Sequence, residues 1–198
     1  MIIKRQIRIL GVDDSPFKRT DKYTQIIGTV FRAGEYMDGL LSSKIRVDGF
    51  DSTDKIIQMI KKSRTKGQLR LIMLDGIALG GFNVMDINKL YKKTKLPVVV
   101  VIRKRPDFKA IEKALKHLSK PKQRLALMKA AGKIHEMKIR HKELRKSGKV
   151  YFQFTGLTEK QTRQALKITI VHGLIPEPIR VAHLIATGIK FGESKGRA

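Results

Sequence analysis

The first part of the chain alternates apolar and polar residues with the two-residue period of a half-buried strand. This alternation predicts strands over residues 7–12, 24–32 and 40–47, with turn residues between the last two. The apolar spacing then changes to that of a helix over residues 52–63. We therefore expect an antiparallel meander of three strands, followed by a helix.

Runs of consecutive apolar residues follow, and their β-branched composition is typical of strands that helices cover on both faces. These runs predict strands over residues 69–74 and 97–102, with a helix over 85–94 between them, and a further strand over 150–154. The other predicted helices span residues 107–118, 122–146, 158–173 and 179–189.

This order of elements predicts a mixed α/β protein whose first strand is central and whose later strands run parallel to it. The 198 residues are enough for a substantial core and few for two domains, so we expect a single domain over residues 1–198. An open flavodoxin-like sheet is the alternative. Such sheets usually begin with a strand–helix unit, whereas this chain begins with three strands.

The composition narrows the class of protein. The chain has no cysteine, which excludes disulfides and thiolate metal sites. Its N-terminus, MIIKRQIRIL, does not resemble a signal peptide, and its longest apolar run, 97–102, is too short to cross a bilayer. We expect a cytoplasmic protein with no membrane partner, because the basic helices also lack the aromatic anchors of peripheral membrane proteins.

The charge of the chain indicates a polyanionic partner. Lys and Arg number 43 against 17 Asp and Glu, a formal net charge of +26. Half of this excess lies in residues 103–149, with 17 basic and 4 acidic residues. A solvated helical face is the plainer explanation, but at this density we expect nucleic-acid contact. The candidate contact residues are Arg103, Lys104, Arg105, Lys129, Lys133 and Arg140.

Aspartates follow two of the predicted strands. Asp13 and Asp14 come at the end of the first strand, and Asp75 ends the strand over 69–74. If these strands are parallel neighbours, Asp13 and Asp75 emerge at the same edge, where sites form in α/β sheets. Two carboxylates at one point repel each other unless a cation joins them. We therefore expect a Mg²⁺ site there, with Mn²⁺ as the alternative.

A third acidic ligand and a phosphate contact are less clearly marked. Asp48 and Asp51 precede the first predicted helix, and either can serve as the third ligand, as a turn residue or as a helix cap. Gly80 and Gly81 allow the backbone to approach a ligand, so their amides are candidates for phosphate contact. His183 lies on an otherwise apolar helix, where a core histidine is the usual explanation.

Four segments together resemble the archaeal deoxyuridine-endonuclease family, which is similar to endonuclease V: GVDDSPF, VDGFDST, LDGIALGGFNVMD and GLIPEPIRVAHLIATGI. The resemblance implies a ribonuclease H-like fold and Mg²⁺-dependent cutting near deaminated bases, a DNA repair activity. It implies site roles for Asp13, Asp75 and His183. Where endonuclease V has a glutamate before its first helix, this chain offers only Asp48 or Asp51.

These observations predict a metal-dependent endonuclease that hydrolyses phosphodiester bonds in nucleic acid, with DNA as the expected substrate and deoxyuridine as a candidate lesion. Asp13 and Asp75 would hold the metal, and His183 would ligate it or move a proton. A non-catalytic nucleic-acid-binding protein on the same fold is the alternative. That alternative explains the charge equally well, but it does not explain why three aspartates stand at the ends of two strands.

Overall fold

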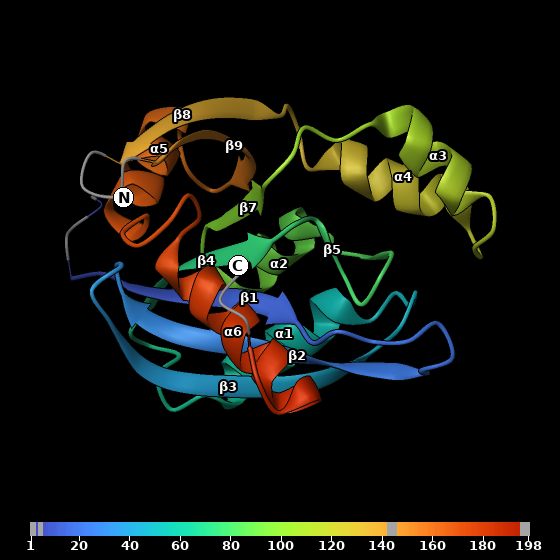
Figure 1. Cartoon of the computed structure of the whole chain (residues 1–198), viewed down its shortest axis with the longest axis horizontal. Helices are drawn as coiled ribbons and strands as arrows, with labels where there is room; N and C mark the ends of the chain where they lie inside the picture. Colours follow the sequence, from blue (N-terminus) through green and yellow to red (C-terminus); the bar gives the residue numbers. More distant parts are fainter. Residues whose placement is uncertain (1–2, 4–5, 142–145, 195–198) are drawn as a thin grey trace.

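The computed structural model describes residue 3, residues 6–141 and residues 146–194 of the chain, and Figure 1 shows its ribbon. The predicted meander is confirmed. It consists of β1 (Arg8–Asp14), β2 (Tyr23–Arg32) and β3 (Tyr36–Arg46), each antiparallel to the next. On its other side, β1 pairs in parallel with β4 (Leu69–Asp75), so β1 is an interior strand as predicted.

One mixed sheet of seven strands carries the fold, in the order β3-β2-β1-β4-β7-β9-β8. Strand β7 (Val98–Ile102) is parallel to β4, as predicted. The prediction is wrong for β9 (Lys146–Thr155), which is antiparallel to β7. The reason is that β8 (His135–His141) and β9 follow each other directly and pair antiparallel, so β9 returns along β7 in the opposite direction.

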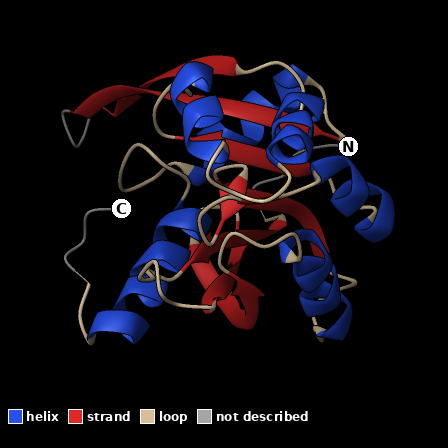
Figure 2. Ribbon diagram, turned by 90° about the vertical axis from the view of Figure 1, so that its right-hand side faces the viewer, coloured by secondary structure: helices blue, strands red, loops and turns tan. Residues whose placement is uncertain are grey.

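Helices cover both faces of the sheet, as Figure 2 shows. Alternate residues of β1 enter two separate cores: Leu10 packs on one face and Ile9 on the other. The covering helices are α1 (Ser52–Lys62) and α2 (Ile87–Thr94) on the first face, and α5 (Glu159–Thr169) and α6 (Glu177–Phe191) on the second.

The long basic helix predicted over 122–146 is wrong. The segment forms α4 (Pro121–Ala130) and then the edge strand β8, whereas the helix predicted over 107–118 is present as α3 (Phe108–Leu115). Gly132, with φ of +90°, lies in the break after α4. The helical prediction relied on the spacing of Ile134 and Met137, but Met137 and the buried Ile139 alternate with basic residues at strand period.

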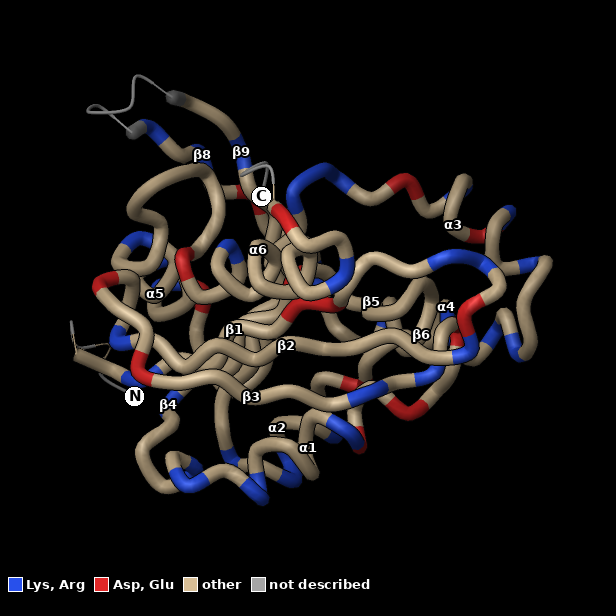
Figure 3. Tube along the Cα trace, turned by 60° about the horizontal axis from the view of Figure 1, so that its bottom comes forward, with Lys and Arg blue, Asp and Glu red and all other residues tan. Residues whose placement is uncertain are grey.

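The basic side chains of this segment are therefore spread over several elements. Figure 3 shows Lys and Arg on α3 and α4 and along the β8–β9 hairpin rather than on one helical face. Residues 142–145, which belong to the predicted basic segment, lie outside the described residues. Among the described residues, no helix has both the length and the apolar character needed to cross a membrane.

A short hairpin after β4 was not predicted. It pairs β5 (Ala78–Leu79) with β6 (Asn83–Val84) and turns at Gly80 and Gly81, whose φ angles are +55° and +81°. A Cβ atom on Gly81 would lie 2.4 Å from a carboxylate oxygen of Asp48. The glycine pair is therefore required by the turn itself and by its close approach to the β3–α1 loop.

Candidate active site

Asp13, Asp75 and His183 meet at the carboxyl edge of the sheet. Val12 and Leu74 are register partners of the parallel β1–β4 pair, so the aspartates that follow them emerge side by side. One ligand atom from each of the two carboxylates and from the imidazole lies within 4.8 Å of the others. Two carboxylate oxygens and an imidazole nitrogen suit a divalent cation such as Mg²⁺ or Mn²⁺. The residues present thus fit the metal that the sequence predicts.

His183 reaches this edge from α6. Its Nδ1 atom lies 2.8 Å from Oδ2 of Asp13, and this hydrogen bond raises the pKa of the imidazole. Asp13 is 5 % exposed and His183 is half-buried, so the contact is sheltered from solvent. The sequence left His183 open between a core role and a site role, and the structure places it against an aspartate at the strand ends.

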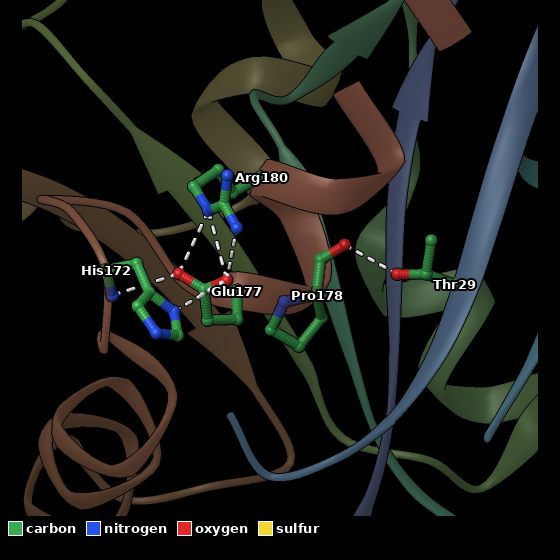
Figure 4. Close-up of polar contacts among 5 residues, drawn as sticks. All are labelled: Thr29, His172, Glu177, Pro178 and Arg180. Atoms are coloured by element: carbon green, nitrogen blue, oxygen red, sulfur yellow. Dashed lines mark hydrogen bonds and ion pairs between the residues drawn. The ribbon is translucent and has the colours of Figure 1, made fainter. Parts of the chain in front are cut away.

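The start of α6 is fixed by a buried glutamate, shown in Figure 4. Glu177 accepts hydrogen bonds from the Arg180 guanidinium, the shortest at 2.7 Å, and from the His172 backbone N–H at 3.1 Å. Burial would raise the pKa of Glu177, but the bonds from Arg180 and His172 outweigh it and lower that pKa. The Pro-Glu-Pro segment therefore anchors the helix that presents His183.

Close packing at Gly11 brings the same helix onto the sheet. A Cβ atom on Gly11 would lie 2.3 Å from the carbonyl carbon of Pro178, so only glycine fits at this point of β1. The Thr29 hydroxyl donates to the Pro178 carbonyl oxygen at 2.6 Å, as Figure 4 shows. Together these contacts fix the distance between α6 and the strand that carries Asp13.

Arg103 belongs to this site, although the sequence grouped it with the nucleic-acid contacts. It follows β7, the parallel neighbour of β4, and its Nη2 atom lies 2.5 Å from Oδ2 of Asp75. Burial and repulsion from Asp13 raise the pKa of Asp75, against the lowering effect of Arg103. The guanidinium thus offsets part of the negative charge that the paired aspartates bring together.

Asp14 is electrostatically linked to the same group. Burial and then repulsion from Asp13 raise its pKa to about 7, with a smaller contribution from Asp75 and an opposing hydrogen bond from the Gly80 backbone. The Asp14 side chain is half-buried. A carboxyl group with this pKa exchanges its proton near neutral pH.

Asp48 and Asp51, the two candidates for a third metal ligand, accept hydrogen bonds from the protein itself. Asp48 accepts from the Phe82 backbone N–H at 2.7 Å, and Asp51 accepts from the Asn83 side-chain amide at 2.7 Å. The structure does not place either residue in the group of Asp13, Asp75 and His183. Both carboxylates instead tie the β3–α1 loop to the β5–β6 hairpin.

Arg124 holds this loop region together through hydrogen bonds, a role that the sequence did not indicate. Its side chain is fully buried, and its guanidinium donates to the backbone carbonyls of Asp48 (2.6 Å), Gly49 (2.9 Å), Ser119 (2.9 Å) and Phe82. A buried arginine bonded to carbonyl groups joins α4 to the loops around it. Nothing in its sequence neighbourhood distinguishes Arg124 from the other basic residues of the segment.

The remaining basic candidates are exposed on separate elements. Lys104 and Arg105 follow β7, Lys129 ends α4, Lys133 precedes β8, and Arg140 lies on β8. The structure therefore leaves all five accessible to a polyanion.

An apolar cavity of about 290 Å³ opens next to Asp75. It is lined by Gly76 and Ile77 after β4, Ile102 at the end of β7, and Phe108 of α3, with Gln153 among its few polar groups. Its size is at the lower limit of small-molecule sites. The cavity lining begins at Gly76, one residue beyond Asp75, and does not include the side chains of the acidic cluster.

Comparison with known proteins decides the family. The family described as "Endonuclease dU" matches residues 5–190. The chain belongs to the endonuclease dU family. A "UPF0215 protein" of the archaeon Methanosarcina mazei is 48 % identical over 196 residues, which is 99 % of this chain and 97 % of the relative. Membership of an endonuclease family indicates a nuclease, and the acidic group is a possible site for its metal.

Solved structures confirm the ribonuclease H-like fold. A protein of unknown function from Archaeoglobus fulgidus matches with a TM-score of 0.81 and 38 % identity, over 92 % of this chain and 98 % of that chain. Endonuclease V of Ciona intestinalis, solved with a 24mer DNA containing an inosine followed by a ribo-adenosine, matches with a TM-score of 0.56 and 14 % identity. That match covers 89 % of this chain and 82 % of the other, and at this identity it shows the fold alone.

Proposed function

We propose that the protein is a metal-dependent endonuclease that hydrolyses phosphodiester bonds in nucleic acid. The observation that carries the proposal is the group of Asp13, Asp75 and His183, whose ligand atoms lie within 4.8 Å of one another at the carboxyl edge. Asp13 contacts His183 and Asp75 contacts Arg103, yet the two carboxylates are close enough that repulsion from Asp13 helps to raise the pKa of Asp75. The family description supports the same conclusion.

Asp13 and Asp75 would hold Mg²⁺ or Mn²⁺, with His183 as a third ligand. The cation would activate water and stabilise negative charge on the phosphodiester. Arg103, whose side chain is 36 % exposed beside Asp75, donates to an oxygen of the bound phosphate. Asp14, whose pKa burial raises to about 7 in the metal-free protein, would hold or release a proton next to the cluster.

The substrate that the site fits best is DNA with a deaminated base such as deoxyuridine. The apolar cavity beside Gly76 is positioned to take a base out of the strand, with Gln153 as a polar group on its wall. A base that pairs weakly costs least to extrude, which favours damaged positions. The exposed basic residues from Lys104 to Arg140 hold phosphates and position the strand without reading its sequence.

The experiment is incubation of the protein with matched oligonucleotides that contain uracil, hypoxanthine or only normal bases. Each is tested with Mg²⁺, with Mn²⁺ and with chelator. We expect cleavage of the uracil-containing strand with either metal and none with chelator. Binding that is strong at low salt, without cleavage under any condition, would instead identify a non-catalytic nucleic-acid-binding protein.

A further inference from the structure

Helix α6 lies across β1 and β2, as Figure 1 shows. Pro178 lies against Gly11 near the start of the helix, and His183 meets Asp13 in its middle. Residues two apart in extended backbone share a face, so Ser15, the residue after β1, continues the α6 side; its backbone N–H still bonds to the Gln25 carbonyl of β2. Ser15 is 4 % exposed.

A cavity of about 260 Å³ lies beside Ser15, between the end of α6 and the meander. The spacing along β1 from Asp13 to Ser15 is about 7 Å, so the cavity adjoins the proposed catalytic group. We call it the flanking pocket. The lining residues used below are Ser15, Tyr23, Gln25, Lys44, Ile189 and Lys190.

Two buried hydroxyl groups lack a hydrogen-bond partner among the described residues, one just after β1 and one on α6. They are Oγ of Ser15 and Oγ1 of Thr187. Thr187 is one turn beyond His183 on the same face of α6, and Lys190 is nearly a further turn along. Buried hydroxyl groups are normally paired, and the unpaired hydroxyl of Ser15 lies in the wall of the pocket, so it points to a polar ligand there.

The walls of the flanking pocket match the two parts of a nucleotide. Tyr23 is 54 % exposed and Ile189 is 57 % exposed, an unusual exposure for large apolar side chains, and both can contact a base. Lys44 and Lys190 supply positive charge, and Lys190 is held in place by Asp21 at 3.2 Å. Among the described residues that line the pocket, none is acidic.

We propose that the flanking pocket binds a nucleotide of the substrate strand next to the one at the acidic cluster. Tyr23 stacks on the base, Lys44 and Lys190 contact the phosphate, and the Ser15 hydroxyl bonds to the sugar–phosphate backbone. This assignment rests on the proposed function, because it takes the nucleic acid strand from that site. It makes the pocket a determinant of sequence context rather than of the lesion.

The test uses the absence of tryptophan from the chain. Tyr23→Trp places a single fluorescent reporter in the pocket, and Tyr36→Trp is the matched control, because Tyr36 is 48 % exposed on β3 and does not line the pocket. Both are made together with Asp75→Asn, so that a uracil-containing single strand is bound but not cut. We expect the strand to quench the Tyr23→Trp protein and to leave the Tyr36→Trp protein unchanged.

An abasic scan of the same strand identifies the nucleotide. We expect one abasic position to weaken binding about tenfold when Tyr23 is present, and to have no effect in a Tyr23→Ala variant. The proposed nucleotide binding would be contradicted if every abasic position weakened binding equally in both proteins. Equal quenching of the tryptophans at positions 23 and 36 would contradict it as well. If the unmodified protein cuts its substrate, the proposed nuclease activity stands even when the pocket proposal fails. If it cuts nothing, the quenching still decides the pocket by itself.

Discussion

Strands β1, β3 and β4 run in the same direction and end at the same edge of the sheet, and aspartates follow each of them. After β3, Asp48 and Asp51 each accept hydrogen bonds from neutral amide donors. After β1 and β4, Asp13 and Asp75 face each other and an imidazole. The first pair bonds to neutral donors, whereas the second bonds to His183 and Arg103 and still carries a carboxylate repulsion that a cation would relieve. The comparison separates structural carboxylates from those available for chemistry.

The two arginines near these regions differ in the same way. Arg124 is fully buried and its guanidinium is committed to loop carbonyls. Arg103 is partly exposed and bonds to a carboxylate that is itself a candidate metal ligand. Removing Arg124 should therefore damage the fold, whereas removing groups around Asp75 should damage the reaction.

The largest expected effect is that of Asp75→Asn on cleavage. The change removes a candidate metal ligand at nearly constant shape, so we expect at least about a thousandfold loss of cleavage, equivalent to about 4 kcal/mol. The metal-free protein should be as stable as before or more so, because a repelling charge is gone. Mg²⁺ should no longer raise the melting temperature. Melting curves with and without Mg²⁺, together with a cleavage assay, measure this.

Asp13→Asn should behave like Asp75→Asn, and Asp48→Asn is the matched control at the same edge. The control should keep its Mg²⁺ response and its cleavage at a temperature where it is folded. If the two site variants only destabilise the fold and still respond to Mg²⁺, the acidic cluster is structural.

Arg124→Met should have the largest effect on stability. It leaves the carbonyls of Gly49, Ser119 and Asp48 without their donor in a buried place, which should cost about 3 kcal/mol or more. For a chain of this length the melting temperature should fall by roughly 6–12 °C. The shift produced by Mg²⁺ should persist, and its loss would mean that the loop region and the acidic cluster are not independent.

The titration of Asp14 should make the metal-free protein less stable as the pH rises from about 4 to about 7. Asp14, with a folded pKa of about 7 against an ordinary 3.8, holds its proton more tightly in the folded state than in the unfolded state. The raised pKa of His183 acts in the same direction, since its contribution is lost as the imidazole deprotonates. The loss due to Asp14 should be at most about 4 kcal/mol.

Asp14→Asn should remove the part of this pH dependence that Asp14 contributes and leave the parts of Asp75 and His183, whereas Asp54→Asn, an exposed substitution on α1, should leave all of it unchanged. Urea unfolding at a series of pH values with chelator measures both. A fall of the same size in the Asp14→Asn variant would assign the titration to other groups.

The smallest effect concerns the exposed basic residues. We replace Lys129, Lys133 and Arg140 together by alanine. The slope of log affinity against log salt concentration should become less steep, by up to about 2.7 for duplex DNA and about 2.1 for single strands. The melting temperature should not change, because all three side chains are exposed. The control replaces Lys61, Lys62 and Lys66, which are exposed around the end of α1. An equal change of slope in both triple variants would mean that nucleic acid responds to the overall charge of the protein and not to a particular basic surface.

The sequence by itself determined the period of most elements and the ends of the two strands that matter. Apolar runs that stop at Asp13 and Asp75 predicted that these residues would share an edge, because parallel neighbouring strands end together. The same local reasoning failed over 122–146, where a spacing of three between apolar residues hid the strand period of Met137 and Ile139. Local pattern encodes backbone geometry, and it is ambiguous where short segments fit two periods.

Tertiary structure alone decided which charged groups meet. Arg103 and Asp75 are far apart in the sequence and are joined because β7 lies beside β4. Asp48 is satisfied by a hairpin whose turn depends on Gly81. Asp14 is half-buried, and part of its environment comes from the Gly80 backbone and from Asp75. The charge and hydrogen-bond state of a side chain depends on neighbours that strand order and loop packing bring together, and no local pattern records them.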